Sequence, residues 1–271
     1  DLSHAPSFLF ILDKLNGSLN NHSLLGHANI SLLNKQVNLN KGQIKLGDDD
    51  FNFSVRIANR WLVNWELKAP DIIEIAPNAT GEINSQGTIV GERKTPHVVA
   101  NLNIKNLGLH ESSLESLDCG IDFYLAHQNS SINLLAKNLI IHNHQIDKIQ
   151  LSANGTLEKN TIVLQTKALP ALVSLNVNGS HQDNKTIFKA TRFNMTSKTW
   201  GNWQLKEPFN LSFLNNAITV SPFSIDSNNS NISGNMNYQE NGAGYLKLMM
   251  TQFPAKIFNS LLPKNTQANA M

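Results

Sequence analysis

The chain has 271 residues, of which 41% are hydrophobic and 15% are charged, a composition typical of a folded protein rather than a disordered one. The 22 basic and 20 acidic residues give a net charge of +2, and the basic residues are scattered, which argues against a nucleic-acid-binding surface. The single cysteine, Cys119, excludes an intramolecular disulfide framework and a zinc cluster built from cysteines.

The front of the chain carries no recognisable targeting segment. The longest apolar run near the start, residues 8–12, ends at Asp13 and is far shorter than the roughly 20 residues needed to span a bilayer as a helix. The sequence has neither an initiator methionine nor a signal peptide there. We therefore expect it to be an internal fragment of a longer protein.

Short runs in which apolar and polar residues alternate predict strands throughout the first part of the chain. Within residues 51–57 every odd position is apolar, and Trp61, Val63, Trp65 and Leu67 share one face of the following run. This period of two is that of a half-buried antiparallel strand. The strands predicted here cover residues 28–33, 36–40, 43–46, 51–57 and 61–67.

Residues 68–78 form the best candidate for a break, because Pro70 and Pro77 bracket a short apolar segment that favours a helical turn. Alternation resumes after it. The strands predicted there cover residues 80–83, 86–90, 97–104, 120–126, 131–136, 139–141, 147–153, 155–157 and 161–166.

The clearest alternation lies in residues 173–213. Apolar residues occupy every second position of 173–178 and again of 209–213, while 179–184 and 199–202 carry turn-forming residues. Further strands are predicted at 217–221, 223–226, 231–238 and 245–251. Residues 253–262 then change to helical spacing and predict a short C-terminal helix, followed by a flexible tail over 263–271.

About twenty short strands with little helix between them predict an all-β fold in which antiparallel strands follow one another in chain order. An open sheet of so many strands must split, close or curl along its length, and a curled sheet encloses an apolar trough that could hold acyl chains. A compact sandwich with its apolar faces packed together explains the same alternation. We expect one elongated segment over residues 1–262.

Sharper chemical signals are few. His142 and His144 are spaced to share a strand face but lack a third metal ligand, so a solvated turn is the simpler interpretation. Asp48, Asp49 and Asp50 lack the spacing of a calcium loop and are expected at a charged hairpin tip. The sequence has no catalytic motif and indicates neither an enzyme nor a cofactor.

Several segments, taken in order, resemble the TamB family within the wider AsmA-like group. The first is Trp61-Leu62-Val63-Asn64-Trp65 with Pro70, followed by residues 77–83 and by the turn at 87–96. Further on, Trp200-Gly201-Asn202-Trp203-Gln204-Leu205 with Pro208 is similar to a recurring family passage, as is the segment 253–263. The resemblance covers nearly the whole chain.

The resemblance implies a curled sheet of the β-taco kind, in a periplasmic part of a protein anchored in the inner membrane. It implies an open hydrophobic groove that shields phospholipid acyl chains during transport between the inner and outer membranes, with no enzymatic activity. The partners implied are a TamA-like outer-membrane barrel and nascent outer-membrane β-barrel proteins, including autotransporters.

From alternation alone, the residues expected to line such a groove are Val173, Leu175, Val177, Leu205, Phe209, Leu211, Phe213, Ile218, Val220, Phe223 and Ile225. Two other interpretations stay open. One is a structural or adhesive β-sheet module with packed faces and no ligand. The other is a glycan-binding sheet, for which Trp200 and Trp203 are the only compact aromatic candidates.

Overall fold

The computed structural model describes residues 7–33, 36–125, 127–142, 144–168, 170–240, 242 and 244–252. These residues are almost entirely strand, with one turn of 3-10 helix, η1 (Ile72–Glu74), so the predicted all-β antiparallel fold is confirmed. The predicted helix at 253–262 and the tail at 263–271 lie outside the described residues. No helix in the described ranges is long and apolar enough to cross a membrane.

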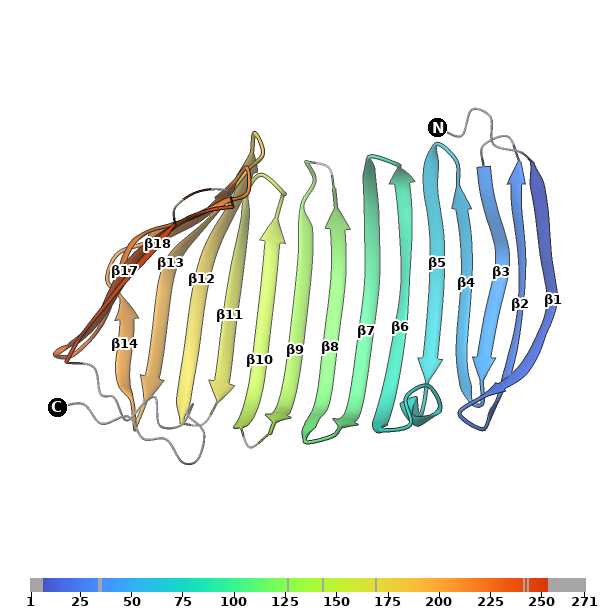
Figure 1. The fold of residues 1–271 in the computed structure, drawn as a ribbon, viewed down its shortest axis with the longest axis horizontal. Helices are drawn as coiled ribbons and strands as arrows, with labels where there is room; N and C mark the ends of the chain where they lie inside the picture. The colour runs from blue at the N-terminus through green and yellow to red at the C-terminus, as the bar shows by residue number, and fades with distance from the viewer. Residues whose placement is uncertain are drawn as a thin grey trace. The chain divides into compact units, whose positions relative to one another are not determined.

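The chain forms two compact units, residues 1–156 and 157–271. In the first unit ten strands pair antiparallel in chain order, each with the next (Figure 1). Residues 70–78 contain η1 and connect β5 (Arg60–Ala69) to β6 (Ala79–Glu92). These two strands pair with each other at ten register positions. The strands are β1 (Phe8–Leu19), β2 (His22–Leu33), β3 (Gln36–Leu46), β4 (Asp49–Ile57), β5 (Arg60–Ala69), β6 (Ala79–Glu92), β7 (Thr95–Leu109), β8 (Ser112–Tyr124), β9 (Ser130–Ile141) and β10 (His144–Gly155).

The second unit contains a strand position that is split in two. β13 pairs with β14 through one half of its length and with β15 through the other, and both short strands pair with β16. Residues 206–208, ending in Pro208, separate them. The strands are β11 (Asn160–Ala168), β12 (Ala171–Gln182), β13 (Lys185–Ser197), β14 (Gly201–Leu205), β15 (Phe209–Leu214), β16 (Ala217–Ser227), β17 (Ser230–Gln239) and β18 (Tyr245–Thr251).

Asparagine-rich pairs form many of the tight turns. Both residues have positive φ in Asn20-Asn21, in Asp183-Asn184 and in Asn215-Asn216, which is the signature of the type I′ turn. This turn matches the twist of the strands on either side, and Asn and Asp tolerate its left-handed backbone better than most residues. The sequence therefore closes long hairpins with only two residues.

The strands are longer and fewer than the sequence predicted. Residues 36–40 and 43–46 belong to one strand, β3, in which the register shifts between Leu39 and Gly42 and Lys41 has a φ of 57°. In the same way β9 runs through Asn138, whose φ is 48°, and joins the two predicted runs at 131–136 and 139–141. The prediction was wrong here because a β-bulge interrupts the alternation without ending the strand.

Each unit has one apolar and one polar face. In the first unit, the register aligns Ile83, Ile104, Leu117, Ala136 and Ile149 in one row across β6 to β10. The adjacent positions point to the opposite face and include Asn84, Asn103 and Asp118 in the neighbouring row. In the second unit, Phe188, Leu211, Val220, Met236 and Leu246 align from β13 to β18.

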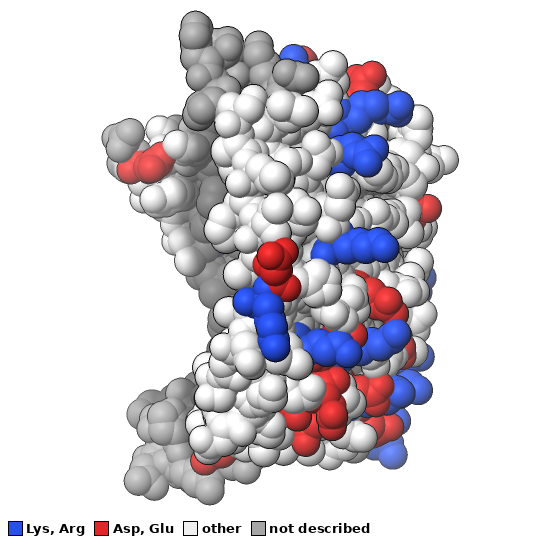
Figure 2. Space-filling view, turned by 90° about the vertical axis from the view of Figure 1, so that its right-hand side faces the viewer, with Lys and Arg blue, Asp and Glu red and all other residues white. Residues whose placement is uncertain are grey.

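Charged side chains lie almost entirely on the polar side. Figure 2, which looks at the molecule from the side of β1, shows Lys, Arg, Asp and Glu gathered along one side of the visible surface. At the paired positions of the described strands, Asp49 is the one Asp, Glu, Lys or Arg residue whose register, opposite Leu46, places it on the apolar face. The alternation of the sequence thus separates charge from apolar surface along each unit.

Candidate functional site

The eleven residues predicted to line a groove lie on one face of the second unit. Val173, Leu175 and Val177 of β12 stand opposite Met195, Phe193 and Ala190 of β13. Opposite the other half of β13, the register places Phe209, Leu211 and Phe213 of β15 on the same face. The pairing of β16 with its neighbours places four more predicted residues on this face: Ile218, Val220, Phe223 and Ile225. Leu205 of β14 stands opposite Ile225.

This face is only partly covered. Phe213 is 37% exposed and the other ten predicted residues are half-buried, so no second layer of the described chain closes over them. Through both units, no large side chain of the described residues is fully buried. A compact sandwich instead fills its interior with fully buried side chains that pack as densely as an organic crystal. The packed-face interpretation therefore finds no support within either unit.

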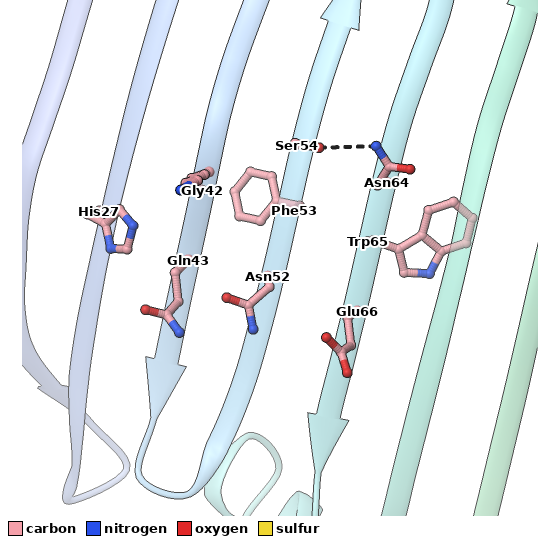
Figure 3. Close-up of a pocket in the computed structure, with 10 residues that line it drawn as sticks. His27, Gly42, Gln43, Asn52, Phe53, Ser54, Asn64, Trp65 and Glu66 are labelled. Carbon is pink, nitrogen blue, oxygen red and sulfur yellow. Dashed lines mark hydrogen bonds between the residues drawn. The ribbon is translucent and has the colours of Figure 1, made fainter.

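Aromatic rings lie flat on the apolar face of the first unit, over glycines of neighbouring strands. A Cβ atom at Gly42 would come within 2.6 Å of the Phe53 ring, and one at Gly87 would collide with the Trp65 ring. The two glycines leave the space that these rings occupy. Figure 3 shows Gly42 on the strand next to Phe53. Phe51 stacks on Phe53 with 4.9 Å between ring centroids. The rings of Phe51, Phe53 and Trp65 therefore form a continuous part of the apolar face.

The concave depressions of the first unit lie on the opposite, polar face. One of about 400 Å³ is bordered by polar side chains from β2 to β5 (Figure 3), and further depressions follow along β5 to β10. In the first, the Asn64 amide donates a hydrogen bond to Ser54 Oγ over 3.2 Å. These depressions are shallow, and Phe53 and Trp65 of the apolar face also contribute to the lining of the first one.

One structured segment covers the apolar face at its end. The connection between β5 and β6 contains η1, and Glu74 at its end reaches the turn between β3 and β4. Five buried residues belong to this segment or to the strand ends beside it: Ala69, Asp49, Ala79, Leu46 and Glu74, none of which is more than 8% exposed. The segment thus closes one end of this apolar face, and we call residues 70–78 the cap.

Two details expected of the polar segments are corrected by the structure. His142 lies in an exposed turn before β10 with a φ of 54°, in line with the solvated-turn interpretation, so it does not share a strand face with His144, which begins β10. The described residues contain no group of three or more metal-ligating side chains. Asp48 is at a hairpin tip, but Asp49 is only 3% exposed because the cap covers it.

The glycan-binding interpretation loses its aromatic platform. Trp203 is 3% exposed, and its indole N–H donates to the carbonyl oxygen of Trp200 over 2.7 Å. Its register partner, Met195, places it on the apolar face with the groove residues. A buried ring cannot stack on a sugar.

Comparison with protein families gives one match. Residues 10–271 match the model of the TamB N-terminal domain. The chain belongs to the TamB family. Members of this family are membrane-anchored envelope proteins of transport and assembly, and the family is not known as enzymatic. Comparison with the curated proteins finds no match.

Sequence reasoning missed part of the apolar face of this TamB-family chain. Phe188 and Phe193 of β13 share the face with the predicted residues. Their numbers differ by five, and in a regular strand two residues an odd number apart would point to opposite faces. A bulge between them, where Thr191 Oγ1 donates to the carbonyl oxygen of Asn176, changes the phase of the alternation. Apolar and polar residues alternate on each side of the bulge, but a rule that carries one phase through the whole strand assigns the residues on one side to the wrong face.

Proposed function

We propose that each unit of this TamB-family chain uses its apolar face to shield phospholipid acyl chains in the periplasm, on a path between the inner and outer membranes. The observation that carries this proposal is the apolar face itself. It extends over many strands, most of its large side chains are half-buried or exposed, and at the paired positions of the described strands Asp49 is its one acidic or basic residue. Exposed apolar surface of this extent in a folded protein indicates a binding partner.

The energetics suit a lipid. Burial of one methylene group gains about 0.8 kcal/mol, so a sixteen-carbon acyl chain that is fully shielded gains on the order of 10 kcal/mol. A half-open face shields only part of each chain, so the gain per lipid is smaller. Flat rings such as those of Phe53 and Trp65 offer contact area without pockets that would fix one chain in place. Such a surface favours holding lipids that can still move along it.

Irregularities in the strands support a curled sheet. The register shifts between Leu12 and Leu15, between His27 and Ile30 and between Leu39 and Gly42 in three successive strands of the first unit. β-bulges increase the local twist and bend the strand that carries them, which is how sheets acquire curvature. We infer that the apolar face lies on the inside of this curvature and forms the groove.

The partners follow from family membership and are part of the proposal. We propose that the full-length protein, anchored in the inner membrane, meets a TamA-like barrel in the outer membrane through regions that include other parts of its chain. We also propose that it supports the assembly of outer-membrane β-barrel proteins, among them autotransporters. Unfolded barrel strands alternate lipid-facing and polar residues, so the same apolar face suits them.

A face-specific crosslinking experiment tests the lipid proposal. A photoreactive amino acid is placed at Leu211 on the apolar face or at Ser212, the next residue of β15, which points to the opposite face. After irradiation in cells, we expect phospholipid adducts at position 211 and none at 212, with phospholipid detected by mass spectrometry in the purified protein. A second matched pair, Leu102 and Asn103, examines the first unit.

Absence of lipid adducts at both apolar positions, together with lipid-free protein, would overturn the proposal. The structural or adhesive module with packed faces would then be favoured. Protein adducts in place of lipid adducts at position 211 would instead assign the face to a protein partner.

A further inference from the structure

The cap is attached to the sheet by hydrogen bonds at two hairpin turns. From the turn between β1 and β2, the Asn20 amide donates to the carbonyl oxygens of Glu74 and Ile75, over 3.0 and 3.2 Å. From the turn between β3 and β4, the backbone N–H groups of Asp48 and Asp49 donate to Glu74 Oε2, over 2.9 and 3.3 Å. Figure 1 shows η1 beside the ends of β5 and β6.

Glu74 is the centre of this attachment. Besides the two backbone donors on Oε2, its Oε1 atom lies 3.3 Å from Nδ1 of His22, the first residue of β2. Gly47 has a φ of 57°, and a Cβ atom there would collide with the Glu74 carboxylate. The turn is therefore shaped around the carboxyl group of Glu74, a residue that is only 8% exposed.

Asp49 lies beside this carboxyl group, and its side chain makes no well-formed hydrogen bond. The side chain is on the apolar face and 3% exposed, neither Oδ1 nor Oδ2 has a partner at full hydrogen-bond geometry, and the backbone N–H of Asp71 is the one donor that acts on its pKa. A buried carboxylate without a partner is strongly disfavoured, whereas a protonated carboxyl group can stay in such a place at lower cost. The charged groups that act on it are Glu74 and Asp71 from the cap and Asp48 from the turn, all of them acidic.

We propose that Asp49 is a proton-responsive latch for the cap: the cap stays docked over the end of the apolar face while Asp49 carries its proton, and it loosens when Asp49 ionises beside Glu74. The cause is repulsion between the carboxylates of Asp49 and Glu74 at a site with little access to water, since the backbone N–H groups of Asp48 and Asp49 hold Glu74 in the turn. Loosening uncovers apolar surface at the end of the sheet. The inference does not depend on lipid binding.

The electrostatics agree with this geometry. Burial raises the pKa of Asp49 from 3.8 to about 6, the charge of Glu74 raises it further in the same direction, and the backbone N–H of Asp71 opposes the shift. An acid whose pKa is higher in the docked state favours docking while it is protonated. Docking of the cap is therefore strongest below about pH 3.8 and weakens as the pH rises from 3.8 to about 6, with little further change above that.

Amide hydrogen exchange of the chain of residues 1–271 at pH 5 and pH 8 tests the latch. The reporters are the amides of Asp48, which donates to Glu74, and Ala76, which donates to the carbonyl oxygen of Ile72 over 2.8 Å. After correction for the intrinsic rates, we expect protection of these amides to fall about tenfold from pH 5 to pH 8. That figure is the part of the roughly hundredfold total that lies between pH 5 and the raised pKa of about 6, because the loss begins at the undocked pKa of 3.8; solvent screening makes it an upper limit.

Two variants identify the titrating group. Asp49→Asn keeps the shape of the side chain but cannot ionise, and we expect high protection at both pH values. His22→Gln removes the other group at Glu74 that can take a proton, and we expect the fall in protection to remain. Amides in β7 and β8 should be unchanged in both variants. A flat response in the wild type, or a response that survives Asp49→Asn and disappears in His22→Gln, would overturn the proposal.

Discussion

Truncation of two aromatic residues on the apolar face of the second unit should have very different costs if that face is open. Trp203 and Phe213 lie on the same face, but Trp203 is 3% exposed and Phe213 is 37% exposed. Replacement of a buried aromatic residue by alanine costs about 3–5 kcal/mol of the free energy of unfolding, through lost burial and the cavity that remains. Only Trp203 meets the condition for the full cost.

The structure sets the expected magnitudes. Trp203→Ala loses the ring and also its hydrogen bond to the Trp200 carbonyl oxygen, which adds about 1 kcal/mol, so we expect a loss of about 4–5 kcal/mol. Phe213 already has over a third of its side chain in water, and its edge-on contact with Phe188 contributes about 0.5–1 kcal/mol. We therefore expect Phe213→Ala to cost about 2 kcal/mol, with little cavity left behind.

Urea denaturation followed by tryptophan fluorescence measures the difference. The replacements Trp61→Phe and Trp65→Phe leave Trp200 and Trp203 as the tryptophans, so the signal reports the second unit. In the Trp203→Ala variant Trp200 alone reports. The midpoint should shift much more for Trp203→Ala than for Phe213→Ala at an unchanged slope. Equal costs of 4 kcal/mol or more would refute the reasoning, because they would mean that Phe213 is covered in solution.

Three further predictions concern the cap and the apolar face. The free energy of unfolding should fall as the pH rises between 3.8 and about 6, because the folded chain holds the Asp49 proton more tightly than the unfolded chain. Asp49→Asn should remove this fall and raise the free energy of unfolding at pH 8 by about 1–2 kcal/mol after solvent screening. Urea titrations below and above this pH range measure both effects. Gly47→Ala should lower stability by at least about 1 kcal/mol in thermal unfolding, since alanine disfavours a φ of 57° and its methyl group would collide with Glu74. Leu211→Asp should leave the chain folded by circular dichroism while it loses copurified phospholipid, and Ser212→Asp on the polar face should change neither property.

The alternation of the sequence predicted the antiparallel strands and the shared face of residues such as Leu175 and Leu211, because a period of two is a local property of a strand. It did not predict where strands continue through a bulge, as at Lys41, because a bulge looks like a turn over three or four residues. The groove itself remains a prediction.

The cap was beyond the reach of local patterns. Asp48, Asp49 and Asp50 read as a charged tip, and only the contact with Glu74, 25 residues further along the chain, buries Asp49. The burial of Trp203 was missed for a different reason: its strand β14 pairs with β13 across a turn of three residues, and alternation does not say which apolar positions are covered. Composition and spacing carry no information about long-range contacts such as that between Asp49 and Glu74.

The split strand in the second unit makes residues 206–208 a place where the chain can change length. β14 and β15 are each held by pairs of their own to β13 and β16, and the Lys206 N–H donates to the carbonyl oxygen of Ser224 beside the gap. Residues added between the half-strands would leave the register of both neighbours as it is, whereas an insertion within any unbroken strand would shift half of its pairs. This joint is therefore where a short reporter peptide could be inserted with the apolar face on either side still in register.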